Sequence, residues 1–127
     1  MDNIKTILCV DDDKLSRLVL QEYIKVLPGQ YIAAEAENGK DCLEFVSRHY
    51  VDLIILDYYL GDMHGDEVFE TISSESINQN VPVVVVSMLD IQDLKNQCID
   101  NNIKNIIQKP YAYEQFEKDV EFVFGNN

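Results

Sequence analysis

The chain has 127 residues, of which 46% are hydrophobic, and its formal net charge is −13 at pH 7. This length and hydrophobic content predict one folded domain over residues 1–127 and exclude a disordered chain. Because only ten Lys and Arg stand against 23 Asp and Glu, the composition excludes direct nucleic-acid binding by a basic face and attraction to an anionic membrane surface.

The first residues and the cysteines indicate a cytoplasmic protein. Residues Met1–Thr6 are polar and lack the basic segment and apolar stretch of a secretory signal. The longest apolar runs extend over only a few residues, too few to span a bilayer. Cys9, Cys42 and Cys98 are odd in number and have no metal-ligand spacing. We interpret them as reduced thiols.

Five short apolar runs predict buried β-strands. Their residues follow one another without polar alternation, as in strands covered on both faces of a parallel sheet. β-Branched residues dominate the third and fourth runs, which favours strand over helix. In chain order the runs are Ile7–Val10, Tyr31–Ala34, Leu53–Leu56, Val83–Val86 and Ile106–Ile107.

Helical periodicity follows each of these runs. The first stripe has a 3.6-residue period and ends at Pro28-Gly29, a pair that stops helices. Asn38-Gly39 marks a turn before the second helix. The apolar positions of the expected helices are, in chain order, Leu15, Leu18, Val19, Tyr23, Ile24 and Leu27, then Leu43, Phe45 and Val46, then Val68, Phe69 and Ile72, then Ile91, Leu94 and Cys98, and finally Phe116, Val120, Val123 and Phe124.

The alternation of five strands with five helices predicts an α/β fold with a doubly wound parallel sheet. Right-handed crossovers should connect its strands. The first, third, fourth and fifth runs are the cleanest, and on that ground we expect those strands to be central.

The residues that end the strands carry most of the functional signal. In open parallel sheets, ligands bind outside the carboxyl ends of the strands. Four of the five strands deliver a polar or charged group to this edge, and Glu35-Ala36-Glu37 after the second strand is assigned no role. The four groups are Asp11-Asp12-Asp13, Asp57, Ser87 and Lys109-Pro110.

This set of side chains suits phosphoryl transfer assisted by a hard cation. Carboxylates that converge repel one another, and a cation relieves the repulsion. Oxygen ligands without His or Cys favour Mg²⁺, which leaves room for phosphate oxygens. A lysine can neutralise a transferred phosphoryl group, a serine can hydrogen-bond it, and a carboxylate can act as its nucleophile. Asp13 is better explained as the N-cap of the first helix.

In their order along the whole chain, these four elements resemble the receiver domain of bacterial response regulators. The resemblance implies a (βα)5 flavodoxin-like, CheY-like fold with strand order 2-1-3-4-5, and a function in two-component phosphorelay signalling rather than as an enzyme. It also implies a small turn residue a few positions after the acceptor, which Gly65 matches.

The resemblance assigns roles residue by residue. Asp57 would be the phosphoacceptor and a ligand of Mg²⁺, Asp12 would bind the metal directly, and Asp11 would act through water. The backbone carbonyl of Tyr59 would complete the protein ligands. No other cofactor is implied.

Two further residues would contact the phosphoryl group. Ser87 would report phosphorylation by moving its hydroxyl onto a phosphoryl oxygen, and Lys109 would pair with the group. The bond between Lys109 and Pro110 would be cis, as this bond usually is in the family.

The sequence departs from the family pattern at three places. Gly61 stands where a proline is frequent, so the loop after the acceptor should be more mobile. Ile106 replaces the aromatic residue that often rotates inward on activation. Met88 replaces a very small residue, and we hypothesise that Tyr59, Met88 and Leu89 screen the acyl phosphate from water.

Three functions compete. The first is a switch that accepts a phosphoryl group from a histidine kinase or a phosphotransfer protein and passes the signal to a downstream protein, which the sequence does not identify. The second is a receiver-like interaction module that is not phosphorylated. The third is an aspartyl phosphatase, which would place an acid where Tyr59 stands. A homodimer is possible through charges on the last two helices, and Lys95, Asp100, Lys118 and Asp119 are candidates.

Overall fold

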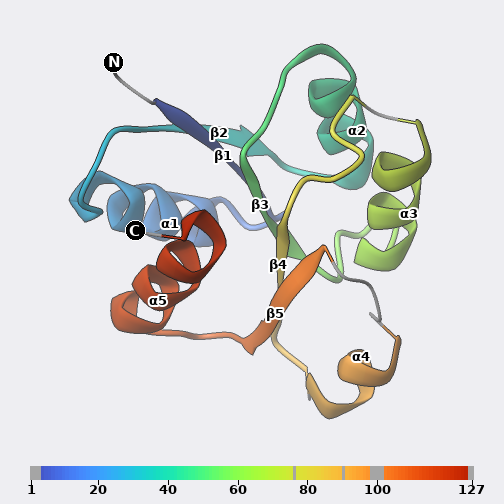
Figure 1. Ribbon diagram of the computed structural model, residues 1–127. Helices are drawn as coiled ribbons and strands as arrows, with labels where there is room; N and C mark the ends of the chain where they lie inside the picture. The colour runs from blue at the N-terminus through green and yellow to red at the C-terminus, as the bar shows by residue number, and fades with distance from the viewer. Residues whose placement is uncertain (1–3, 76, 90, 98–101, 126–127) are drawn as a thin grey trace.

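The computed structural model describes residues 4–75, 77–89, 91–97 and 102–125 (Figure 1). Within these ranges, strands and helices alternate along the chain. The strands are β1 (Lys5–Val10), β2 (Tyr31–Ala36), β3 (Leu53–Asp57), β4 (Val83–Ser87) and β5 (Ile103–Gln108). The helices are α1 (Lys14–Val26), α2 (Gly39–Arg48), α3 (Gly65–Glu75), α4 (Ile91–Gln97) and α5 (Tyr113–Phe124).

The strands form one parallel sheet in the order β2-β1-β3-β4-β5. The predicted fold class and strand order are therefore confirmed. The prediction that the fifth strand is central was wrong, because β5 lies at an edge. Its run at Ile106 and Ile107 is nevertheless buried, since helices cover both faces of the sheet even at this edge. An apolar run therefore reports coverage of the faces, not distance from the edge.

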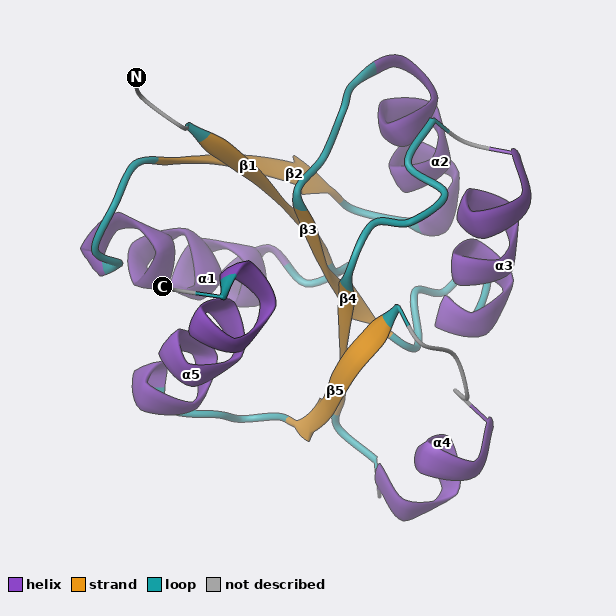
Figure 2. Cartoon of the chain, viewed as in Figure 1, coloured by secondary structure: helices purple, strands orange, loops and turns teal. Residues whose placement is uncertain are grey.

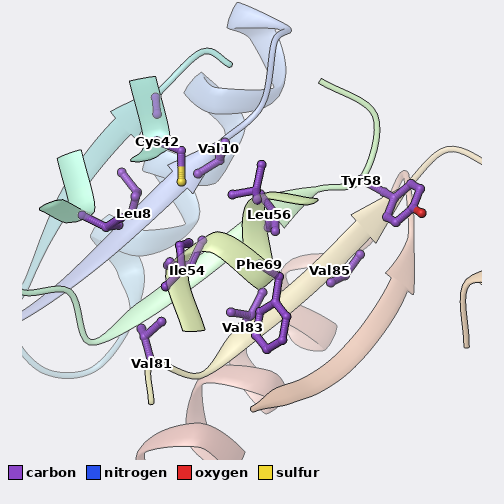
Figure 3. Packing of buried hydrophobic residues seen from close by; sticks show 14 of the residues in the cluster. Leu8, Val10, Cys42, Ile54, Leu56, Tyr58, Phe69, Val81, Val83 and Val85 are labelled. Carbon is purple, nitrogen blue, oxygen red and sulfur yellow. The ribbon is translucent and has the colours of Figure 1, made fainter. Parts of the chain in front are cut away.

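Helices cover the sheet on both sides (Figure 2). One face packs against α1 and α5, with Leu20, Ile24, Phe116 and Val120 in the core. The other face packs against α2, α3 and α4 and forms the larger cluster, in which Phe69 lies over the strands (Figure 3). Strands β3 and β4 are buried along their whole length, as their continuous apolar runs predict.

Helix α1 differs from its predicted packing. Ile24 and Leu27 are buried as expected, together with Leu20. Leu18 and Val19, which were expected in the same stripe, are 46% and 43% exposed. The physical reason is that Leu20, Ile24 and Leu27 follow one another at helical spacing on the face toward the sheet, which leaves the other apolar positions on the outer face.

A buried asparagine joins the connections at the other end of the sheet. Asn78 is 2% exposed, and its Oδ1 accepts a hydrogen bond of 2.9 Å from the Val51 amide. Its Nδ2 donates to the carbonyl oxygens of Val46 and His49, both at 2.9 Å. The side chain thereby ties the segment before β4 to the last turn of α2 and to the segment between α2 and β3.

Among the described residues, no helix is long and apolar enough to cross a membrane. Cys9 and Cys42 are buried free thiols. Cys98, and Asp100 of the proposed dimer charges, lie outside the described residues.

Candidate functional site

Three carboxylates meet at the carboxyl ends of β1 and β3. Asp11 and Asp12 directly follow β1, and Asp57 is the last residue of β3. Each of the three offers a carboxylate oxygen within 4.8 Å of the others. Asp11 and Asp57 are buried, at 6% and 7% exposure, and Asp12 is exposed. The parallel sheet therefore brings together the acidic residues that the sequence placed at one edge.

Lys109, which follows β5, reaches into this acidic cluster. Its Nζ donates to Asp11 Oδ2 and, at 3.1 Å, to Asp57 Oδ2. Its amide donates to the Ser87 carbonyl oxygen at 2.8 Å, which extends the pairing of β5 with β4. The Lys109–Pro110 bond is cis, as the resemblance implies.

Burial and the neighbouring charges shift the pKa values of Asp57 and Lys109. Burial raises the pKa of Asp57 to about 6, Lys109 opposes this rise, and the charge of Asp11 adds to it. Burial lowers the pKa of Lys109, but its hydrogen bond to Asp11 and the charge of Asp57 outweigh this effect, so its pKa is raised. Lys109 therefore stays charged, while the Asp57 carboxylate is held in a costly ionised form near neutral pH.

Ser87 lies at the end of β4 and is fully buried. Its hydroxyl oxygen accepts a hydrogen bond of 3.1 Å from the Leu89 amide. Among the described residues, the Ser87 hydroxyl oxygen bonds to the Leu89 amide and not to Asp57. The hydroxyl group is therefore bonded within its own loop.

The remaining sequence-predicted residues surround the cluster. Asp13 caps α1 by accepting from the Ser16 amide at 3.1 Å, as the N-cap interpretation predicts. The Tyr59 amide donates to Asp57 Oδ1 at 3.3 Å. Met88 and Leu89 line the same cleft as Asp57, and both side chains are exposed at its rim.

Ile106 is 8% exposed and belongs to the core cluster between the sheet and helices α2 to α4. The residue that replaces the expected aromatic is therefore packed inside.

Sequence reasoning missed three residues that shape the site. Arg17 donates from Nε to Glu35 Oε1 at 2.9 Å and from a guanidinium nitrogen to the Asp11 carbonyl oxygen at 2.7 Å. It thereby fixes the loop after β1 and gives Glu35 the role that the sequence left open. Asp62, on the loop after β3, bonds to the first amides of α2. Unlike charges without a fixed spacing were the sequence signal for the pair of Arg17 and Glu35, whereas the bonds of Asp62 to backbone amides had no sequence signal.

The cluster fits a hard divalent cation. It offers three carboxylates, and no histidine or cysteine belongs to this group of residues. Asp12 is exposed, so its carboxylate is accessible to an ion from solvent. Oxygen ligands of this kind suit Mg²⁺, which binds through one or two carboxylates and keeps several waters.

Comparison with known proteins identifies the family of the chain. Residues 7–121 match the family model described as the response regulator receiver domain. The chain is 28% identical over 105 residues to the two-component response regulator ORR5 of Oryza sativa subsp. japonica. This alignment covers 82% of this chain and 77% of the relative.

Other relatives are longer. The chain is 30% identical over 116 residues to a protein-glutamate methylesterase/protein-glutamine glutaminase of Treponema denticola. This alignment covers 90% of this chain but 30% of the relative. It spans 27% of a relative with the same description from Treponema pallidum. The shared part in these proteins is thus a minor fraction of their length.

Solved structures have the same fold. The phosphorylated cyanobacterial phytochrome response regulator RcpA superposes with a TM-score of 0.83 at 23% identity, covering 98% of this chain and 97% of that one. The receiver domain of a sensor histidine kinase from Pseudomonas aeruginosa, with magnesium coordinated in its active-site cleft, gives 0.84 at 18% identity and covers 97% and 99%.

Proposed function

The chain belongs to the response regulator receiver domain family, and on that premise we propose that it is a phosphoryl-accepting switch of a two-component phosphorelay with Asp57 as the acceptor. The observation that carries the proposal is the cluster of Asp11, Asp12 and Asp57 bridged by Lys109. Family members of this kind are switches, and the relatives that are enzymes owe their activity to other domains.

The proposed reaction transfers a phosphoryl group from a phosphohistidine of the donor. A carboxylate oxygen of Asp57 forms a bond to phosphorus, the bond between phosphorus and the imidazole nitrogen breaks, and its electron pair stays on that nitrogen. Lys109 pairs with the phosphoryl oxygens, and Ser87 turns its hydroxyl from the Leu89 amide toward one of them. These residues mainly position and neutralise the group, which is what phosphoryl transfer requires.

Asp57, Asp12 and the Tyr59 carbonyl would hold the Mg²⁺ ion, and Asp11 would bind it through water. When bound, the ion supplies positive charge to the phosphoryl oxygens. The acidic cluster supports this assignment.

We propose that the donor docks on the outer face of α1. Leu15, Leu18 and Val19 are exposed there, and two of them line a pocket that continues to Met88 and Lys109. Large exposed apolar side chains in a contiguous group mark interaction sites. A donor seated on this face would bring its histidine to the cleft that holds Asp57. Receiver domains interact with histidine kinases or phosphotransfer proteins, and such a protein is the proposed donor.

Phosphorylation would shift an equilibrium between two surfaces of the last helices and β5, which a downstream protein would bind. Ile106 would transmit the change by repacking in the core rather than by rotation of an aromatic ring. We further propose that residues 1–127 act as one receiver domain in the cytoplasm, where Cys9 and Cys42 stay reduced, and that any homodimer uses the same helices.

The test is the intact mass of the protein after incubation with Mg²⁺ and acetyl phosphate, with Asp57→Ala alongside. A gain of one phosphoryl group in the wild type alone, abolished by removal of Mg²⁺, is the expected result. The absence of any gain, with acetyl phosphate and with a protein donor, would favour the alternative of an interaction module that is not phosphorylated.

A further inference from the structure

The loop that follows the acceptor is bonded to the beginning of a neighbouring helix. Asp62 Oδ1 accepts from the Gly39 amide at 2.9 Å, and its Oδ2 accepts from the Lys40 amide at 3.0 Å. These are first-turn amides of α2, which lack a carbonyl partner within the helix. Asn38 caps the next amide, that of Asp41, at 2.7 Å. The loop therefore supplies two of the three caps of α2.

A second contact joins the same two segments. The side chain of Met63 packs directly against Gly39, which is buried. A Cβ atom at Gly39 would meet the Cγ of Met63 and lie 2.6 Å from its Sδ, closer than side chains approach. The consecutive loop residues Asp62 and Met63 thus both contact the first turn of α2. The missing side chain of Gly39 makes this close approach possible.

Hydrogen bonds within the loop connect Asp62 and Met63 to the residues that directly follow Asp57. Tyr59 forms an isolated antiparallel bridge with His64, and the Leu60 amide donates to the Met63 carbonyl oxygen at 3.3 Å. Both pairs enclose Gly61, which has a φ of +86° and was expected to make the loop mobile. Because Asp62 is adjacent to Gly61, its bonds to α2 restrict the conformations that glycine would otherwise permit.

We propose that Asp62 is a positioning residue, which clamps the loop after the acceptor onto α2 and thereby holds the Tyr59 carbonyl beside Asp57. These bonds restrict the loop in place of the proline that is frequent at the position of Gly61. Its role toward the cation rests on the proposed function, whereas the clamp itself does not depend on it. Asp62 is not a ligand in this proposal, and it acts only through the backbone of the loop.

The test uses Asp62→Ala, Asp62→Asn and the matched control Glu37→Gln. Asparagine keeps one acceptor oxygen but removes the charge, and Glu37 is an exposed acid two residues before Gly39. In the metal-free proteins, amide exchange at Gly39 and Lys40 is expected to accelerate about tenfold in Asp62→Ala, because each amide loses its acceptor. It should accelerate less in Asp62→Asn and stay unchanged in Glu37→Gln.

Titration with Mg²⁺ alone gives the second readout. We expect the Kd for Mg²⁺ to rise about tenfold in Asp62→Ala, by an intermediate factor in Asp62→Asn, and less than about twofold in Glu37→Gln. Equal weakening in all three would mean that only charge matters and would overturn the proposal. Faster exchange with an unchanged Kd would do the same, since the clamp would then be merely structural.

The two proposals fail in different ways. If the wild type neither binds Mg²⁺ nor gains a phosphoryl group, the proposed function fails, and the role of Asp62 toward the cation fails with it. If the wild type does both and the Asp62 variants bind Mg²⁺ as tightly, only the positioning role is overturned. Should Asp62→Ala not fold, the comparison of Asp62→Asn with Glu37→Gln decides, because both remove one charge and only the former weakens the clamp.

Discussion

Replacing Asp57 by asparagine should make the metal-free protein more stable at neutral pH. Asp57 is 7% exposed, and burial outweighs the attraction of Lys109, so that its pKa rises from 3.8 to about 6. A pKa raised by folding means that the ionised carboxylate opposes folding. Asparagine has nearly the same shape and no charge, and it removes this opposition.

The size of the effect follows from the pKa. A rise from 3.8 to about 6, at about 1.4 kcal/mol per pKa unit, corresponds to at most about 3 kcal/mol in the free energy of unfolding. Below the unfolded pKa the carboxyl group is neutral in both states, and the penalty is absent. It grows as the pH rises from about 4 to about 6 and is constant above that. The gain from Asp57→Asn should follow the same curve.

Urea unfolding followed by far-UV circular dichroism, in the presence of a chelator, measures this gain, since the chain has no tryptophan for fluorescence. The two proteins are compared at about pH 7 and at about pH 4. Added Mg²⁺ should stabilise the wild type by mass action and narrow the difference. An asparagine variant that is no more stable at neutral pH, or a gain that is the same at both pH values, would refute the reasoning.

Leu18→Asp on the outer face of α1 places a charge in the proposed apolar docking face. It should slow phosphoryl transfer from a protein donor at least about tenfold and leave labelling by acetyl phosphate unchanged. Equal losses of the two rates would contradict the docking proposal. Met88→Ala should shorten the lifetime of the phosphorylated protein by about two- to threefold, measured as loss of the added mass after donor removal; an unchanged lifetime would exclude the screen. Asn78→Ala should lower the free energy of unfolding by about 2–4 kcal/mol, because buried backbone groups lose their partners, and urea titration showing less than about 1 kcal/mol would contradict this.

The fold and the acidic cluster were predictable because they depend on short-range patterns and on topology. Apolar runs define strands, and in a parallel sheet all carboxyl ends share one edge, so Asp57 and Lys109 were expected at the same edge. The edge position of β5 was misjudged from its apolar run, because α4 and α5 bury its faces there as well. The outer face of α1 was misjudged because Leu15 and Leu18 are as apolar as residues that pack inside.

The contacts that hold the loops were beyond the sequence. Arg17 meets Glu35 across 18 positions, and Asp62 meets Gly39 across 23. Such pairings depend on the angle at which a loop leaves its strand, and no periodicity encodes that angle. In physical terms, the sequence pattern determines where charges gather but not which amide or guanidinium group fixes them.

The bridge from Lys109 to Asp11 and Asp57 has a consequence for the order in which ligands act. Three carboxylates and one ammonium group leave the metal-free cluster with two negative charges, and a phosphoryl group on Asp57 would make this about three. A divalent cation would reduce that excess to about one, so phosphorylation and the cation favour each other. Because such coupling is reciprocal, the phosphorylated protein would bind Mg²⁺ more tightly, and removal of the ion would weaken the phosphorylated state by the same factor. The phosphoryl group and the metal ion would then stabilise each other on the domain, so the population of the phosphorylated form would depend on the concentration of the ion.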